Sequence, residues 1–180
     1  MNFVQEIFAR MIRNRQPDQD GLILKGSFIA EHIRNGLKIG EYCGNNGITV
    51  VGKNLILDTM FGNSTPVAQI DPWYIGLIDN SPAPVLVEAD TLASHAGWTE
   101  LTAYAGTRKA WDDANAASKV KGTNAAAIFT FNATKTVYGL MIASVTSGTS
   151  GILWSTGAFS TGPADFVNND VLNVTYSLRC

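Results

Sequence analysis

The residues of this chain that could do metal or acid–base chemistry are few and widely separated. It contains two histidines, His32 and His95, and neither has a second His or Cys at the spacing of a metal-ligand pair. The sequence therefore predicts no metal site. We expect each imidazole to be a hydrogen-bonded structural or surface group.

Two pairs of carboxylates could in principle serve general acid–base catalysis, which needs two such groups at one cleft: Asp90 with Glu100, or Asp112 with Asp113. Adjacent aspartates in a polar segment usually form a solvated surface. The chain also has no Gly-x-Ser-x-Gly elbow, no P-loop and no glycine-rich dinucleotide fingerprint. A small polysaccharide hydrolase is the enzymatic alternative, but we expect no enzymatic activity and no cofactor.

Composition narrows the class of partner. The chain has 180 residues, 46% of them hydrophobic, a formal charge of −2 and only 16% charged residues, where a soluble domain typically has about 25%. This length suits one compact core. Phosphate-backbone binding needs clustered Lys and Arg, so no nucleic-acid partner is expected. Cys43 and Cys180 either pair or stay free, and free thiols are the expectation.

No stretch approaches the ~20 apolar residues of a membrane span. The chain starts with an amphipathic segment that contains Glu6, whereas a signal peptide has a basic head followed by an apolar run. We expect no membrane partner and a chain that is retained in the cytoplasm where it is made.

An apolar stripe with helical spacing opens the sequence. It consists of Phe3, Val4, Ile7, Phe8, Met11 and Ile12, while Gln5, Glu6, Arg10 and Arg13 occupy the other face. The predicted helix ends by Pro17, and residues 18–21 form a linker. So short a helix is unstable alone in water, so the stripe must dock on a surface. That surface belongs to its own domain, to another subunit or partner protein, or to a membrane.

The remainder of the chain has mostly strand patterns. Residues 22–33 and 37–42 predict a hairpin through Asn35-Gly36, and residues 127–131, 137–143, 152–155 and 171–178 predict later strands. Residues 50–61 have helical spacing and end at Gly62, which predicts one short internal helix. The polar stretch 112–124 predicts an exposed loop.

Tryptophans punctuate the segment from residue 71 to 111. Residues 73–78 predict a strand with both faces covered, residues 101–104 a second, and Asp90 a cap for one helical turn that Gly97 closes. Gly76 lies inside the first strand, and Gly139 lies inside a later one. Each predicts a bulge or a close approach by another backbone. We expect Trp73, Trp98, Trp111 and Trp154 to be packing anchors in the core or at an interface.

These patterns predict an all-β fold of eight or nine short strands. The absence of β–α–β alternation favours an antiparallel β-sandwich, jelly-roll-like or with Greek-key connections. We expect an N-terminal helical arm and linker over residues 1–20 and a sandwich domain over residues 21–180.

Several segments carry a family resemblance. Residues 73–78 (WYIGLI), 89–100 (ADTLASHAGWTE), 132–139 (NATKTVYG), 152–155 (ILWS) and 169–176 (NDVLNVTY) resemble virion proteins of tailed, podovirus-like bacteriophages. The resemblance extends over roughly residues 22–178. It departs at Arg108-Lys109, where the family pattern has Arg-Pro, and the arm is an addition to the pattern.

The resemblance implies a capsid decoration or cement protein, a β-sandwich on the outside of the phage head. Its implied partners are the major capsid protein and itself, as a dimer or trimer, and its implied location is the capsid surface of the virion. The six stripe residues Phe3, Val4, Ile7, Phe8, Met11 and Ile12 are the candidate docking element. The alternative is a tail-fibre or tail accessory sandwich that binds a receptor or glycan through exposed rings of Trp98, Tyr104 or Trp154.

Overall fold

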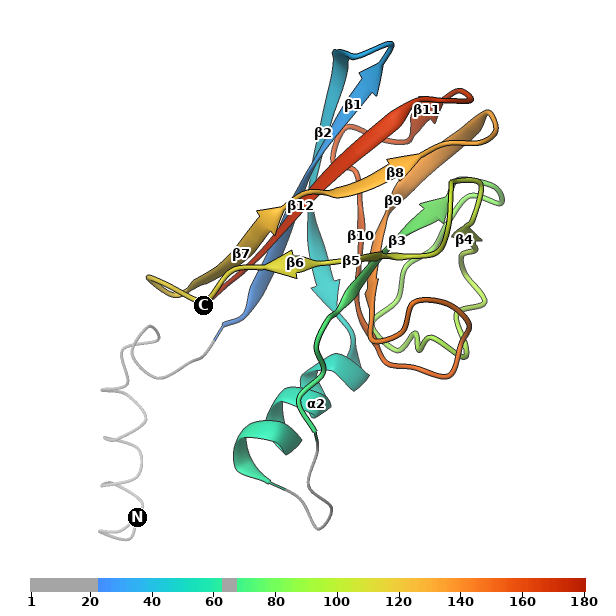
Figure 1. Cartoon of the computed structure of the whole chain (residues 1–180). Coiled ribbons are helices and arrows are strands. Elements are labelled where there is room, and N and C mark those ends of the chain that lie inside the picture. Colours follow the sequence, from blue (N-terminus) through green and yellow to red (C-terminus); the bar gives the residue numbers. More distant parts are fainter. Residues whose placement is uncertain (1–22, 63–67) are drawn as a thin grey trace, which may run out of the picture.

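The structure is a computed structural model that describes residues 23–62 and 68–180. These residues form one α-helix and twelve strands, and the strands join into a single curled sheet in which every pairing is antiparallel (Figure 1). The predicted all-β antiparallel class is confirmed. The apolar stripe and the linker lie outside the described residues.

The elements follow one another along the chain as β1 (Lys25–Arg34), β2 (Leu37–Ile48), α2 (Val50–Phe61), β3 (Tyr74–Asp79), β4 (Glu100–Leu101), β5 (Lys109–Ala110), β6 (Asp112–Asp113), β7 (Val120–Ala125), β8 (Ala127–Thr130), β9 (Lys135–Ala143), β10 (Leu153–Ala158), β11 (Ala164–Phe166) and β12 (Val171–Arg179). The main path across the sheet is β4-β3-β9-β10-β2-β1-β12-β7-β6. Three strands lie off this path, because β11 pairs with β9, β5 with β3 and β8 with β12.

The first hairpin forms where the sequence predicts it. Asn35 and Gly36 have φ angles of 52° and 79°, the left-handed pair that a two-residue turn between twisted strands requires. β2 is longer than predicted, because it runs through Asn45 and Asn46 to Ile48 and there joins β10. That short pairing connects the two halves of the sheet.

The core lies inside the curl, where β1, β8 and β12 face β3 and β9. Phe129, Leu172, Ile75 and Leu77 are fully buried in one cluster. A nearly continuous apolar run such as β3 is covered on both faces, as its pattern predicts. Gly139 in β9 is explained by a close backbone approach, because a Cβ there would lie 2.1 Å from the carbonyl oxygen of Gly157.

Three local predictions are wrong. Residues 88–97 form turns and bends without a helical turn, because the Asp90 carboxylate accepts from the backbone N–H of Val87, behind it, and from the Trp98 indole. The predicted strand over 101–104 ends at Leu101, and Tyr104 makes only an isolated bridge to Phe131. The predicted loop over 112–124 contains β6 and most of β7.

The β6–β7 connection escaped prediction because its turn uses no glycine. Ser118 and Lys119 take left-handed φ angles of 50° and 64° between the bridged residues Ala117 and Val120. This is the geometry of a two-residue hairpin turn built from residues that rarely adopt it. The polar composition of residues 112–124 therefore predicts a loop where the chain forms a hairpin.

Candidate functional site

The predicted internal helix is confirmed, and only its first half is pressed against the sheet. Thr49 caps α2 by accepting a hydrogen bond from the Gly52 N–H (3.1 Å), and its hydroxyl donates to the Leu153 carbonyl (2.5 Å). Gly52 is buried, and a larger residue would not fit, because a Cβ there would lie 2.7 Å from the Trp154 carbonyl oxygen. The second half projects away from the strands (Figure 1).

Two sides of α2 carry apolar side chains. Val50, Leu57 and Phe61 recur at helical spacing and are 44%, 54% and 78% exposed; we call them the outer face of α2. On another side, Leu55, Ile56 and Met60 line a cavity. A helix that is apolar nearly all round is ordinarily buried. Much of α2 therefore offers apolar surface that the described residues leave uncovered.

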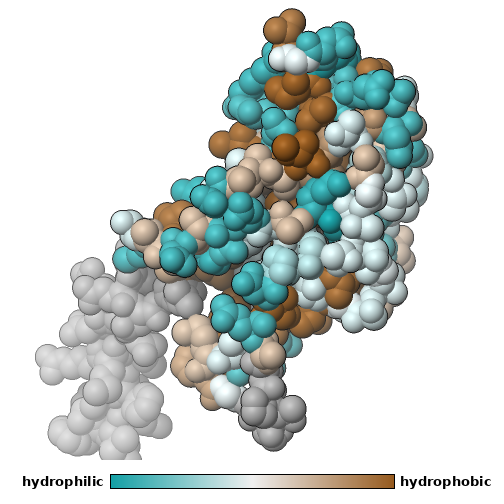
Figure 2. Space-filling model, viewed as in Figure 1, coloured by the Kyte–Doolittle hydropathy of each residue, from teal (hydrophilic) through white to brown (hydrophobic). Residues whose placement is uncertain are grey.

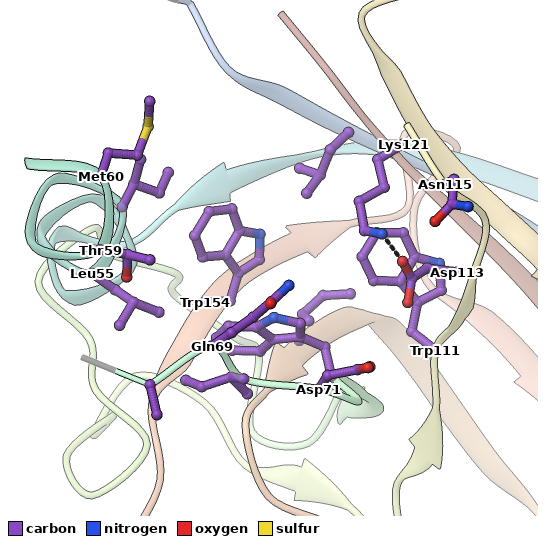
Figure 3. A pocket seen from close by; sticks show the side chains of 16 residues that line it. Leu55, Thr59, Met60, Gln69, Asp71, Trp111, Asp113, Asn115, Lys121 and Trp154 are labelled. Carbon is purple, nitrogen blue, oxygen red and sulfur yellow. Dashed lines mark ion pairs between the residues drawn. The ribbon is translucent and has the colours of Figure 1, made fainter. Parts of the chain in front are cut away.

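The cavity lies between α2 and the β6–β7 hairpin, and we call it the α2 groove. Its volume is about 710 Å³, within the ~300–1,000 Å³ typical of binding clefts. Trp73, Trp154 and Ile142 form its apolar floor, and Trp111 and Leu178 form part of the far wall. Figure 3 shows Trp154 between the helix and the hairpin.

Polar residues line the groove toward the hairpin and toward the chain that leads into β3. They are Gln69, Asp71, Asp113, Asn115 and Lys121. Lys121 forms an ion pair with Asp113 and places its ammonium 5.9 Å from the centre of the Trp111 ring (Figure 3). The groove thus combines an apolar floor with a polar rim.

Hydrogen bonds fix the tryptophans of the groove. The Trp111 indole donates to the Thr123 hydroxyl (2.8 Å), and the Trp154 indole donates to the Tyr176 hydroxyl (3.2 Å). Burial raises the pKa of Tyr176 to about 12, so this phenol stays neutral. Trp73 lies 5.7 Å from Trp154, centre to centre. The prediction that tryptophans act as packing anchors is confirmed for Trp98, Trp111 and Trp154, which are buried in the chain's own core, whereas Trp73 is only partly buried.

His32 is a buried structural imidazole. Its Nε2 lies 2.7 Å from an Asp170 carboxylate oxygen, and its Nδ1 lies 3.4 Å from the Tyr42 hydroxyl. Arg34 donates to both oxygens of Asp170, at 2.8 and 2.7 Å. These hydrogen bonds, chiefly those from Arg34, hold the pKa of Asp170 well below its usual range. The cluster ties β1 to the turn that precedes β12.

The carboxylates proposed as pairs have separate partners. Glu100 forms a bidentate ion pair with Arg108 (2.7 Å for both contacts), and Arg108 also donates to the carbonyls of Val145 and Gly148. Asp90 is held by Trp98. His95 stacks on Trp98 with ring centres 3.9 Å apart. Neither candidate carboxylate pair has both of its members in the groove, and only Asp113 lies on the rim.

The described part of the chain contains neither a metal-ligand cluster nor a membrane-spanning helix. There, no group of three His, Cys, Asp or Glu side chains is placed to hold an ion. Residues 23–62 and 68–180 contain no helix long and apolar enough to cross a bilayer. Both cysteines are exposed free thiols.

The groove was not predicted from the sequence. Helical spacing predicts that Leu55 and Met60 lie on a helix, but the sequence predicts a loop where the structure has the hairpin of the far wall. Comparison of the chain with models of protein families, and with curated proteins, gives no match.

Proposed function

We propose that this chain is a non-enzymatic structural protein of a tailed bacteriophage, a decoration or cement protein that binds the major capsid protein at the virion surface. The uncovered outer face of α2 is the observation that carries the proposal. Val50, Leu57 and Phe61 expose apolar surface on an element that stands away from the sheet. Such surface is typical of a protein-binding site.

The family resemblance supplies the identity of the partner. In this proposal the curled sheet is a jelly-roll-like β-sandwich. Its weakly charged surface, on which hydrophilic and hydrophobic residues are mixed (Figure 2), costs little to desolvate against a shell. Copies associate as a dimer or trimer, since closed homo-oligomers are the usual solution. Repeated attachment over a lattice adds avidity to each contact. The protein is made in the host cytoplasm before it joins the head.

The rival function, a tail protein that binds glycans, lacks the ring surface it needs. Trp98, Tyr104 and Trp154 are 3%, 3% and 7% exposed. A sugar stacks on the open face of an aromatic ring, and these rings expose at most an edge. The geometry therefore favours protein contact over sugar stacking.

Co-sedimentation with phage shells that lack this protein tests the proposal. Replacing Leu57 and Phe61 with Gln removes the apolar contact, and hot-spot side chains typically contribute ~1–2 kcal/mol or more each. We expect the double variant to bind at least about tenfold more weakly. Ile128→Gln is the matched control, because Ile128 lies in β8 and its exposed fraction of 56% is similar to the 54% of Leu57.

Two outcomes would overturn the proposal. One is wild-type protein that fails to bind the shells at all. The other is equal binding by wild type and the double variant, which would leave the outer face of α2 without the proposed role. Circular dichroism of each variant checks that the fold is intact.

A further inference from the structure

The groove side of α2 needs a cover of its own. Leu55, Ile56 and Met60 face a cavity of about 710 Å³ whose floor is apolar. They line the same cavity as Trp154 and the hairpin residues Asp113 and Lys121, and none of them belongs to the outer face proposed to bind the capsid. A partner on the outer face would leave this cavity open.

The groove has the chemistry that receives an amphipathic helix. Such a helix lays its apolar stripe on an apolar floor and keeps its polar face at the rim. Here the floor is the half-buried Trp73 together with the groove-facing edges of Trp154 and Ile142, which are otherwise buried, and the rim carries Asp71 and the Asp113–Lys121 pair. A glycan or a small polar ligand would find few open polar groups on the floor and the far wall, because the Trp154 and Trp111 indoles already donate to Tyr176 and Thr123.

The course of the chain brings a suitable segment to the groove. In the sheet, Gly26 near the start of β1 is paired with Leu178, and Leu178 is paired with Lys121. Leu178 and Lys121 both line the groove. The chain that precedes β1 therefore enters the sheet one strand away from the cavity wall.

The preceding chain carries the apolar stripe of Phe3, Val4, Ile7, Phe8, Met11 and Ile12. Residues 13–22 separate this stripe from Ile23. Ten residues can span up to ~33–36 Å when extended, so the stripe can reach the groove of its own chain. We propose that the α2 groove is the docking site of this chain's own N-terminal stripe, which covers the groove side of α2.

Tethering and charge both favour this occupant. A segment joined by a short linker has an effective concentration in the millimolar range, which a second copy in dilute solution does not reach. The predicted helix carries Arg10 and Arg13 beside its stripe. On the rim Asp113 is already paired with Lys121, which leaves the Asp71 carboxylate as the acidic group that can face one of these arginines.

Paramagnetic broadening of tryptophan signals tests the docking without any shell, so its failure is separable from failure of the capsid role. Cys43 and Cys180 are first changed to Ser, because both thiols are exposed. Glu6→Cys on the polar face of the stripe then carries a nitroxide label. The readout is the four indole N–H signals of protein labelled with ¹⁵N at tryptophan.

We expect strong broadening for Trp73, Trp111 and Trp154, which line the groove. Trp98 packs in a separate cluster with Ile78 and Leu92 and should keep its intensity. Ile7→Asp in the labelled protein should restore the Trp73, Trp111 and Trp154 signals, because a carboxylate cannot lie on the apolar floor. Gln5→Asp, on the polar face, is the matched control and should leave the broadening in place.

The other occupants give distinct results. Mixing spin-labelled unenriched chains with unlabelled ¹⁵N chains broadens Trp73, Trp111 and Trp154 only if the stripe docks on a second copy. Broadening in this mixture, equal broadening of all four signals, or none at all would each overturn the proposal.

Discussion

Asp170 is the residue on which the buried polar cluster of His32 and Arg34 depends. Its side chain is 1% exposed and accepts hydrogen bonds from Arg34, His32 and the Val167 backbone. Removing one partner of a buried charge cluster leaves the others unpaired. We expect Asp170→Asn to lower the free energy of unfolding at pH 7 by ~2–4 kcal/mol, as measured by urea denaturation. Asp165→Asn, at an exposed neighbour, should change it by less than ~0.5 kcal/mol.

The same residue makes stability depend on pH. The folded pKa of Asp170 lies below that of an unfolded aspartate, near ~3.9. As pH falls, the unfolded chain binds this proton first, so the stabilisation is complete above about pH 5 and is lost progressively below it. Wild type and Asp170→Asn should therefore differ most at pH 7 and converge toward pH 3. Urea unfolding curves that stay equally far apart at both values would contradict this.

Gly139 lets strand β9 approach the backbone of strand β10 closely, because it has no Cβ. A Cβ at this position would lie 2.1 Å from the Gly157 oxygen and 2.8 Å from the Ala158 Cα, both backbone atoms of the paired strand β10. Backbone cannot move aside cheaply, so Gly139→Ala should destabilise by roughly 2 kcal/mol or more. Gly122→Ala in β7 is the control, since a Cβ there meets nothing within 4 Å. Midpoints of chemical unfolding should separate the two, and equal midpoints would rule out the close approach.

At the scale of elements, the sequence predicts what depends on local periodicity and turn chemistry. The Asn35-Gly36 hairpin, the helix over residues 50–61 and the last strand follow from short-range rules. The β6–β7 hairpin does not, because Ser118 and Lys119 are held in left-handed geometry by the strands around them. The groove could not be predicted either, because its walls come from α2 and the β6–β7 hairpin, which are far apart in the sequence and meet only in the folded chain.

The start of α2 offers a test of element-level stability. Thr49 is 1% exposed, caps the helix through Gly52 and donates to β10 through the Leu153 carbonyl. Thr49→Ala removes both contacts and should lower the free energy of unfolding by ~1–2 kcal/mol. Thr49→Ser keeps the hydroxyl and should stay within about 0.5 kcal/mol of wild type. Thermal unfolding with helix and sheet signals recorded together measures both, and identical effects of the two variants would contradict the capping role.

For the whole molecule, α2 is the element around which the two proposals meet. Its outer face is offered to a shell, and its groove side to the chain's own N-terminal stripe. The two surfaces share the helix but use different side chains, Leu57 and Phe61 on one and Leu55 and Ile56 on the other. A helix that is apolar on nearly all sides is then covered on both.

The charge of the whole molecule predicts how attachment to the shell responds to salt. Only 16% of residues are charged, and the proposed contact is made by apolar side chains. Salt screens ion pairs with a Debye length of ~10 Å at 0.1 M but leaves apolar burial largely intact. We expect the dissociation constant for shells to change by less than about threefold between 50 and 500 mM NaCl in co-sedimentation. Calorimetry of the same binding should give a negative heat-capacity change, the mark of apolar burial. A steep loss of binding with salt would show instead that charged groups hold the protein to the shell.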